Sequence, residues 1–165
     1  ILLYLGGRIG LAPTDEDGRL WTHQIQLTIT DIVAEVYNSH HPIDEDKWFH
    51  EQKHEAIARA AVFSRDRMPK FLGWFERILE ANPAGADHLV GSSATYADLS
   101  LFQLIEGLRF AFPHASAREL KKLPRVTALH KAVAKRPRLK AYLASERRVP
   151  FTDTGIFRRY AELDG

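Results

Sequence analysis

The segment LVGSSATYADLSLF, residues 89–102, contains the sharpest helix start in the sequence. Thr95 has a side chain that favours the N-cap position, and Asp98 follows three residues later, where its carboxylate can accept the amide of Thr95. The apolar residues that come next recur at helical spacing and predict a helix that ends at about Phe112. Because the cap uses both polar side chains, we interpret Thr95 and Asp98 as structural residues and not as catalytic ones.

A longer amphipathic helix is predicted earlier in the chain, from about Glu16 to His40. Thr14 and Asp17 have the spacing of a capping box at its start. Pro42 ends the helix, because a proline ring disfavours helical geometry in the residue before it. The apolar residues of this helix share one face, and they are Ile25, Ile29, Ile32, Val33, Val36, Tyr37 and His40.

Another long helix is predicted between these two, from about Asp44 to Glu80. Its buried side is formed by Ala56, Ala60, Phe63, Phe71, Trp74, Phe75, Ile78 and Leu79. Pro69 removes an internal hydrogen bond, so we expect a kink near this residue. The sequence Asn82-Pro83 then stops the helix.

Short helices are predicted in the last third of the chain. Pro113 closes the helix that begins at Thr95, and Pro124 and Pro137 suit the first turns of two further helices. The tail beyond Pro150 contains aromatic residues, so we expect it to pack on the helices. No segment shows the period-two alternation of a strand. The predicted fold class is therefore all-α.

The composition is that of a folded protein of ordinary polarity. The 165 residues suit one compact domain, with 45% apolar and 27% charged residues. The net charge is +2, and the basic and acidic residues are interspersed, which argues against a dedicated nucleic-acid surface. No apolar run approaches the roughly 18 residues of a membrane span. The absence of cysteine fits a reducing cytosol, so we expect a cytoplasmic protein without nucleic-acid or membrane partners.

The stretch HEQKH, residues 50–54, matches the H-E-x-x-H pattern in which two histidines bind zinc and the glutamate activates a water. A catalytic zinc needs a third protein ligand. The metzincin continuation would place Gly and His where this chain has Ile57 and Ala60. Glu76 would lie roughly tens of ångströms away along the same helix, and Lys53 adds a cation inside the motif. We therefore expect a solvent-exposed, metal-free stretch at the start of the second long helix.

Three other groups of residues allow two interpretations each. His40 and His41 either interact with the end of their helix or lie at the mouth of a pocket. Asp31 belongs either to a solvated polar stripe or to a functional site. A set of basic residues near the C-terminus forms either a solvated face, which we favour, or a nucleic-acid surface: Lys121, Lys122, Arg125, Lys135, Arg136, Arg138 and Lys140.

Three segments together resemble cytosolic glutathione transferases. LVGSSATYADLSLFQLIEGL, residues 89–108, is similar to the family's L-V-G, short loop, T-x-A-D and apolar helix. RPRLKAYLASER, residues 136–147, resembles the family's penultimate helix, and ILLYLGGRIGL, residues 1–11, resembles the helix that closes its thioredoxin-like domain. The three segments occur in the family's order, so the resemblance covers nearly the whole chain.

The resemblance implies a division of the chain and a function. Residues 1–12 correspond to the end of the last helix of the thioredoxin-like domain and a linker, and residues 13–165 to the C-terminal helical domain. The family conjugates glutathione, as co-substrate and without a metal, to apolar electrophiles, and its members form homodimers. Residues outside this chain would activate the thiolate, so no catalytic residue is assigned and the chain alone is expected to be inactive. A non-catalytic assembly module is the alternative.

The resemblance also implies roles for individual residues. Asp31 corresponds to an acidic residue that meets the α-amino group of glutathione in the partner subunit. Tyr37 and His41 correspond to positions that face the electrophile. Phe157 lies in the tail, which covers the electrophile pocket in several classes of the family.

Overall fold

The computed structural model describes residues 1–165 and contains helices but no strands, which confirms the all-α prediction. The helices are α1 (Leu2–Arg8), α2 (Glu16–Asn38), α3 (Lys53–Val62), α4 (Met68–Ala81), α5 (Tyr96–Ala111), α6 (Pro113–Leu120), α7 (Pro124–Ala134) and α8 (Pro137–Leu143). Two 3₁₀ turns, Phe49–Glu51 and Ala161–Leu163, and a π-helical turn, Phe63–Arg67, complete the regular structure. None of the helices combines the length and the apolarity that a bilayer span requires.

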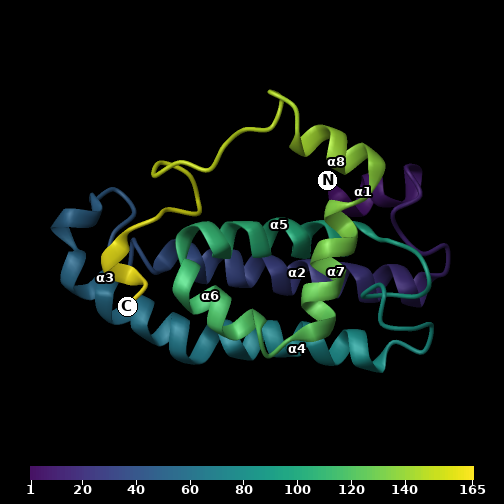
Figure 1. Ribbon diagram of the computed structural model, residues 1–165, viewed down its shortest axis with the longest axis horizontal. Helices are drawn as coiled ribbons and strands as arrows, with labels where there is room; N and C mark the ends of the chain where they lie inside the picture. The colour runs from purple at the N-terminus through teal and green to yellow at the C-terminus, as the bar shows by residue number, and fades with distance from the viewer.

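The apolar core lies among α2, α4 and α5. Figure 1 shows α2 and α5 running side by side, with α4 below them and with α6 and α7 crossing in front. The core face of α2 is the predicted one, because Ile25, Ile29, Ile32 and Val36 are each at most 3% exposed. Burying one such side chain stabilises the fold by roughly 2 kcal/mol. These helices therefore form the frame on which the loops and the tail are placed.

The helix α2 begins at Glu16, as predicted, but its cap differs from the prediction. The N-cap is Asp15 and not Thr14, and its carboxylate accepts the amide of Gly18 at 2.7 Å. Asp is a slightly better N-cap than Thr. Gly18 also allows the close approach, because a Cβ there would lie 2.7 Å from the Cβ of Pro13 and 3.0 Å from the Asp15 carboxylate. The pairing of Thr14 with Asp17 is therefore wrong.

The predicted helix start at Asp44 is also wrong, because α3 begins only at Lys53. The reason is the side chain of Gln52, which is 1% exposed. Its Oε1 accepts the amides of Ile43 and Asp44 at 3.0 and 3.3 Å. Its Nε2 donates to the carbonyls of Asp44 and Lys47 at 2.9 and 3.0 Å. These four bonds satisfy the backbone of the loop without a helix.

The helix is irregular before Pro69, as predicted. A π-helical turn, Phe63–Arg67, separates α3 from α4, and Pro69 lies in the first turn of α4. A proline is tolerated there, and the wider turn before it accommodates its ring. Arg67 fixes this turn to α2, since its Nε and Nη2 donate to the carboxylate of Glu35 at 2.9 and 2.5 Å.

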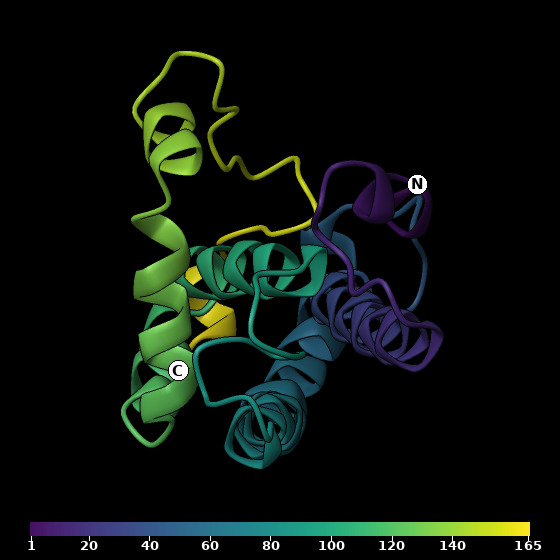
Figure 2. The same ribbon diagram turned by 90° about the vertical axis from the view of Figure 1, so that its right-hand side faces the viewer.

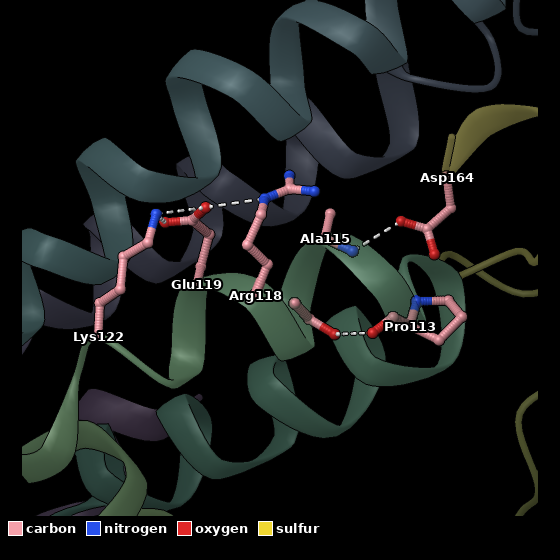
Figure 3. Close-up of polar contacts among 7 residues, drawn as sticks. Pro113, Ala115, Arg118, Glu119, Lys122 and Asp164 are labelled. Carbon is pink, nitrogen blue, oxygen red and sulfur yellow. Dashed lines mark hydrogen bonds and ion pairs between the residues drawn. The ribbon is translucent and has the colours of Figure 1, made fainter.

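The helix α6 was not predicted. Pro113 follows the end of α5, but it also occupies the first turn of α6. The carboxylate of Asp164 caps this helix by accepting the amides of His114 and Ala115 at 2.6 and 2.9 Å. Figure 3 shows the bond to Ala115. A cap that comes from a residue 50 positions away leaves no local pattern in the sequence.

The C-terminal tail packs on the bundle, which confirms the prediction. Figure 1 shows the yellow tail running back from α8 and ending beside α3. Tyr160 stacks on Phe49 with ring centroids 3.9 Å apart, and Leu163 is 4% exposed in the core. Lys53 and Glu162 form an ion pair at 2.6 Å. The last residues therefore connect α3, the turn before it and α6.

Candidate functional site

Asp98 is the centre of the segment that starts α5. Its side chain is fully buried and accepts hydrogen bonds from the amides of Leu89 and Thr95 at 2.8 and 2.6 Å. The hydroxyl of Thr95 donates a third bond at 2.9 Å. The predicted cap is present in the structure, and the bond to Leu89 extends it across the preceding loop. Because these donors surround the carboxylate, Asp98 holds the loop and the helix together.

Tyr37 and His41 lie together where α2 ends. Their rings stack with centroids 4.9 Å apart and an interplanar angle of 6°, and His41 is 6% exposed. The returning tail contacts this pair, because Nη1 of Arg158 lies 3.2 Å from Nε2 of His41. The structure therefore brings two predicted substrate residues together and adds Arg158, which the sequence did not indicate.

A chain of hydrogen bonds through two buried imidazoles determines their tautomers. Arg158 can only donate, so Nε2 of His41 accepts and Nδ1 of His41 carries the proton. This Nδ1 lies 2.5 Å from Nδ1 of His40, which accepts. Nε2 of His40 then carries its proton and donates to the carbonyl of Ile156 at 3.0 Å. Every donor meets an acceptor only while both rings are neutral.

The surroundings of the two histidines favour their neutral forms. Burial lowers the pKa of His40 to about 4, and the hydrogen bond to Ile156 offsets only part of this effect. Burial, followed by the charge of Arg158, lowers the pKa of His41. At neutral pH the imidazoles of His40 and His41 are therefore uncharged. Neither ring holds a proton that it could release as a general acid at this pH.

Phe157 belongs to the same turn of the tail, but its ring packs on α5. A Cβ at Gly107 would lie 2.4 Å from the Phe157 ring, so the absence of a side chain at Gly107 makes the contact possible. Phe151 meets Phe157 edge to face at 5.9 Å between centroids. The tail is thus fixed on α2 through Ile156 and Arg158, and on α5 through Phe157.

A pocket of about 350 Å³ opens beside His41. Its other lining residues are Asn38, Pro42, Ile43, Asp44, Glu45 and Arg59. Two carboxylates and a guanidinium make this pocket polar, whereas small organic ligands are held mainly by apolar and aromatic side chains. This pocket is therefore not the apolar electrophile pocket that the resemblance implies. The apolar pocket stays a prediction.

Asp31 lies apart from Tyr37 and His41. It is exposed on α2. Tyr37 follows six positions later on the helix, which corresponds to about 9 Å along the axis and a different face. Asp31 instead shares a stripe with Leu20 and Leu27, which are 59% and 49% exposed. It therefore borders an uncovered apolar surface of α2.

The HEQKH stretch is not a continuous exposed helix start. Gln52 is buried, so the expectation of exposure is wrong at this residue, whereas the other four residues are exposed. His50 lies in a 3₁₀ turn and His54 in α3, so the two histidines do not share one helical face. No group of three or more His, Cys, Asp or Glu side chains in residues 1–165 is arranged to hold a metal ion.

Two residues of this region escaped the sequence analysis for different reasons. Gly107 interrupts an otherwise apolar helix, and such a glycine can signal the close approach of another group. Arg158 has no local signal, because its partner His41 is 117 residues away.

Comparison with known proteins decides the family. The family described as "Glutathione S-transferase, C-terminal domain" matches residues 37–146, which is more than half of the chain. The chain belongs to the glutathione S-transferase family. The matched residues begin at Tyr37 and include His41, the loop held by Gln52 and the cap of α5. The resemblance that the cap segment suggested is therefore confirmed.

Known glutathione S-transferases share sequence with part of this chain. That of Plasmodium yoelii yoelii is 30% identical over 86 residues, which are 52% of this chain and 38% of the relative. Glutathione S-transferase P 1 of Bufo bufo is 34% identical over 79 residues, which are 48% of this chain and 36% of the relative. These matches therefore span well under half of the length of each relative.

Solved structures share the fold. Prostaglandin synthase D of Nilaparvata lugens superimposes with a TM-score of 0.72 at 19% identity, and the match covers 91% of this chain and 67% of that one. The Pi-class glutathione S-transferase of Onchocerca volvulus superimposes with a TM-score of 0.61 at 20% identity, covering 86% of this chain and 61% of that one. At these identities the likeness shows the fold alone.

Proposed function

We propose that this member of the glutathione S-transferase family conjugates glutathione to apolar electrophiles, as a cytoplasmic homodimer with a role in detoxification. Residues 13–165 supply the electrophile side of the site, and residues 1–12 end a thioredoxin-like domain and lead into a linker. The observation that carries the proposal is the tail held over the end of α2, beside Tyr37 and His41. Glutathione is the co-substrate, and no metal takes part.

The proposed reaction divides the chemistry between two parts of the protein. The sulfur of glutathione attacks an electrophilic carbon, a C–S bond forms, and the leaving group departs with its electron pair. A free thiol has a pKa of about 8.5, and hydrogen bonds to the thiolate lower it. We assign that activation to the thioredoxin-like domain. We propose that the aromatic rings of Tyr37, His41 and Phe157 face the electrophile, because aromatic side chains bind apolar ligands.

We further propose that α2 forms part of the dimer interface. Leu20, Trp21 and Leu27 are 59%, 41% and 49% exposed, which is unusual for large apolar side chains on one helix. Asp31 lies at the end of this surface and is exposed. Its carboxylate is therefore available to the α-amino group of glutathione in the partner subunit, as a charge-assisted hydrogen bond.

The division of the chemistry can be tested with 1-chloro-2,4-dinitrobenzene as the electrophile. We expect the 165-residue chain alone to show no turnover above the uncatalysed reaction. We expect turnover when the chain follows the thioredoxin-like domain of the Onchocerca volvulus Pi-class enzyme. Substantial turnover by the chain alone would contradict the proposed location of the activating group. A folded fusion that binds glutathione without conjugating it would favour the assembly module.

The role of Asp31 is tested in the same fusion. Asp31→Asn should raise the KM for glutathione about tenfold and leave kcat nearly unchanged, because the lost contact binds glutathione and does not touch the reacting atoms. Asp17→Asn removes the same charge from the exposed first turn of α2 and serves as the control. Equal effects of the two variants would contradict the assignment of Asp31.

A further inference from the structure

Arg158 is a half-buried cation that has no anionic partner in the chain. It contacts His41, yet it takes part in none of the ion pairs of the structure. Other arginines in similar surroundings are paired. Arg148, earlier in the same tail, lies 3.2 Å from a carboxylate oxygen of Glu106. The positive charge of Arg158 is therefore available to a ligand.

The position of Arg158 is fixed by its neighbours. Its Nε donates to the carbonyl of Gly155 at 2.9 Å, and its Nη1 lies 3.2 Å from Nε2 of His41. Figure 2 shows the tail looping away from the bundle after α8 and then returning to it. Where it returns, Ile156 and Phe157 anchor it on α2 and α5. A side chain that is already ordered loses little conformational entropy when it binds a ligand.

The guanidinium of Arg158 keeps hydrogen-bond donors free. An arginine side chain has five N–H donors in a planar fork. Gly155 and His41 accept from two of the five, so three remain, on Nη1 and Nη2. A carboxylate can accept from both Nη atoms at once, and this planar, two-bond geometry is the one that arginine favours. The free donors therefore match a carboxylate.

The surroundings of Arg158 set the charge that a ligand can carry. The imidazole of His41 is neutral, because burial lowers its pKa, so it adds no second cation. Glu45 is close enough to raise the pKa of His41 by its charge, but it forms no ion pair with Arg158. One unpaired guanidinium beside a neutral ring suits a monovalent anion better than a phosphate, which carries nearly two charges.

We propose that Arg158 selects electrophiles that carry a carboxylate on an aromatic body. It binds the carboxylate while the aromatic ring faces Tyr37 and His41. This inference rests on the proposed function and narrows its substrate class. The carboxylate is not the reacting group, so Arg158 determines specificity and does not activate the thiolate.

Two electrophiles that differ in one charge test the role of Arg158: 4-chloro-3,5-dinitrobenzoate and its methyl ester. In both, the thiolate of glutathione attacks the ring carbon that bears chlorine, a C–S bond forms, and chloride leaves with the electron pair. The fusion with the thioredoxin-like domain is assayed, and kcat/KM for the carboxylate is divided by kcat/KM for the ester. A change in the shape of the site affects both compounds and largely cancels in this ratio.

Arg158→Met should lower the ratio about tenfold, because only the carboxylate loses a charge-assisted hydrogen bond. Arg158→Lys should keep part of the preference, since it retains the charge but not the planar fork. Glu45→Gln should raise the ratio about twofold, because it removes a repulsion from the carboxylate. Arg159→Met is the matched control. It removes the same charge at an exposed neighbour and should leave the ratio within about twofold of wild type.

The outcomes separate this inference from the function on which it rests. Conjugation of both compounds with an unchanged ratio in Arg158→Met would overturn the role of Arg158 and leave the proposed function standing. An equal fall in Arg159→Met, or a fall in Glu45→Gln, would overturn that role as well. Conjugation of neither compound by the unmodified fusion would overturn the proposed function and this inference together. Far-UV circular dichroism checks that each variant is folded.

Discussion

At the scale of single residues, Gln52 determines how the chain passes from α2 to α3. Its amide has one orientation only, because Oε1 accepts two backbone amides and Nε2 donates to two carbonyls. The residue also explains why HEQKH is a poor guide to function. Within HEQKH, the side chain that holds the loop is the central Gln52, whereas the two histidines are exposed.

We predict that Gln52→Glu destabilises the fold by about 2–4 kcal/mol at neutral pH. The change keeps the shape of the side chain but removes both donors, and it places a carboxylate against the carbonyls of Asp44 and Lys47. Urea denaturation of the two proteins measures the difference. Gln103→Glu, at an exposed position of α5, should change stability by less than about 0.5 kcal/mol. Similar values for the two variants would contradict the role of Gln52.

At the scale of elements, the contact between α5 and the tail depends on a glycine. Gly107 is an interior residue of α5, where alanine is normally preferred by about 1 kcal/mol. The ring of Phe157 occupies the space that a Cβ would take, at 2.4 Å. The helix therefore accepts a weaker helix former so that the tail can lie close to it.

We predict that Gly107→Ala fails to stabilise the protein and exposes the tail to limited proteolysis. In a Phe157→Ala background, the same substitution should raise the free energy of unfolding by about 1 kcal/mol, because the overlap is gone and only helix propensity remains. Wild type, the two single variants and the double variant form a double-mutant cycle. Thermal unfolding of these four proteins measures the coupling between Gly107 and Phe157.

Gly73→Ala in α4 is the control for this cycle. The nearest atom to a Cβ at Gly73 is the flexible Nη1 of Arg77 at 3.6 Å. This substitution should stabilise the protein by about 1 kcal/mol with or without Phe157. If Gly107→Ala stabilises the wild-type background equally, the packing of Phe157 does not determine the residue at this position.

At the scale of the whole molecule, the buried pair His40 and His41, which contacts the C-terminal tail, makes the stability of the fold depend on pH. His40 has a folded-state pKa of about 4, below its ordinary value of 6.5, so the unfolded chain binds more protons between these two pH values. Stability is therefore highest above about pH 6.5 and falls as the pH decreases towards 4. The lowered pKa of His41 acts in the same direction.

We predict that His40 accounts for up to about 3 kcal/mol of the stability lost between pH 7 and pH 4. His40→Gln should therefore reduce the loss in the free energy of unfolding between pH 7 and pH 4. Urea denaturation at several pH values measures this loss in both proteins. His54→Gln, at an exposed histidine, should leave the decline unchanged. An equally steep decline in His40→Gln would show that the buried pair does not control the pH dependence.

The sequence by itself determined the features that depend on neighbouring residues. The apolar face of α2, the cap at Thr95 and Asp98, and the irregular helix before Pro69 follow from periodicity, side-chain capping and proline geometry. The resemblance of residues 89–108 to the glutathione transferases also needed no structure. These signals are local, because a helix repeats every 3.6 residues and its caps act within one turn.

Only the tertiary structure decided the features that join distant residues. Asp164 caps α6 from 50 residues away, and Arg158 meets His41 from 117 residues away. Lys121, Lys131 and Lys140 line one cavity. They come from the end of α6, from α7 and from α8, whose relative positions depend on core packing. A side chain can meet such partners only after the chain has folded, so no pattern within a short window of the sequence contains this information.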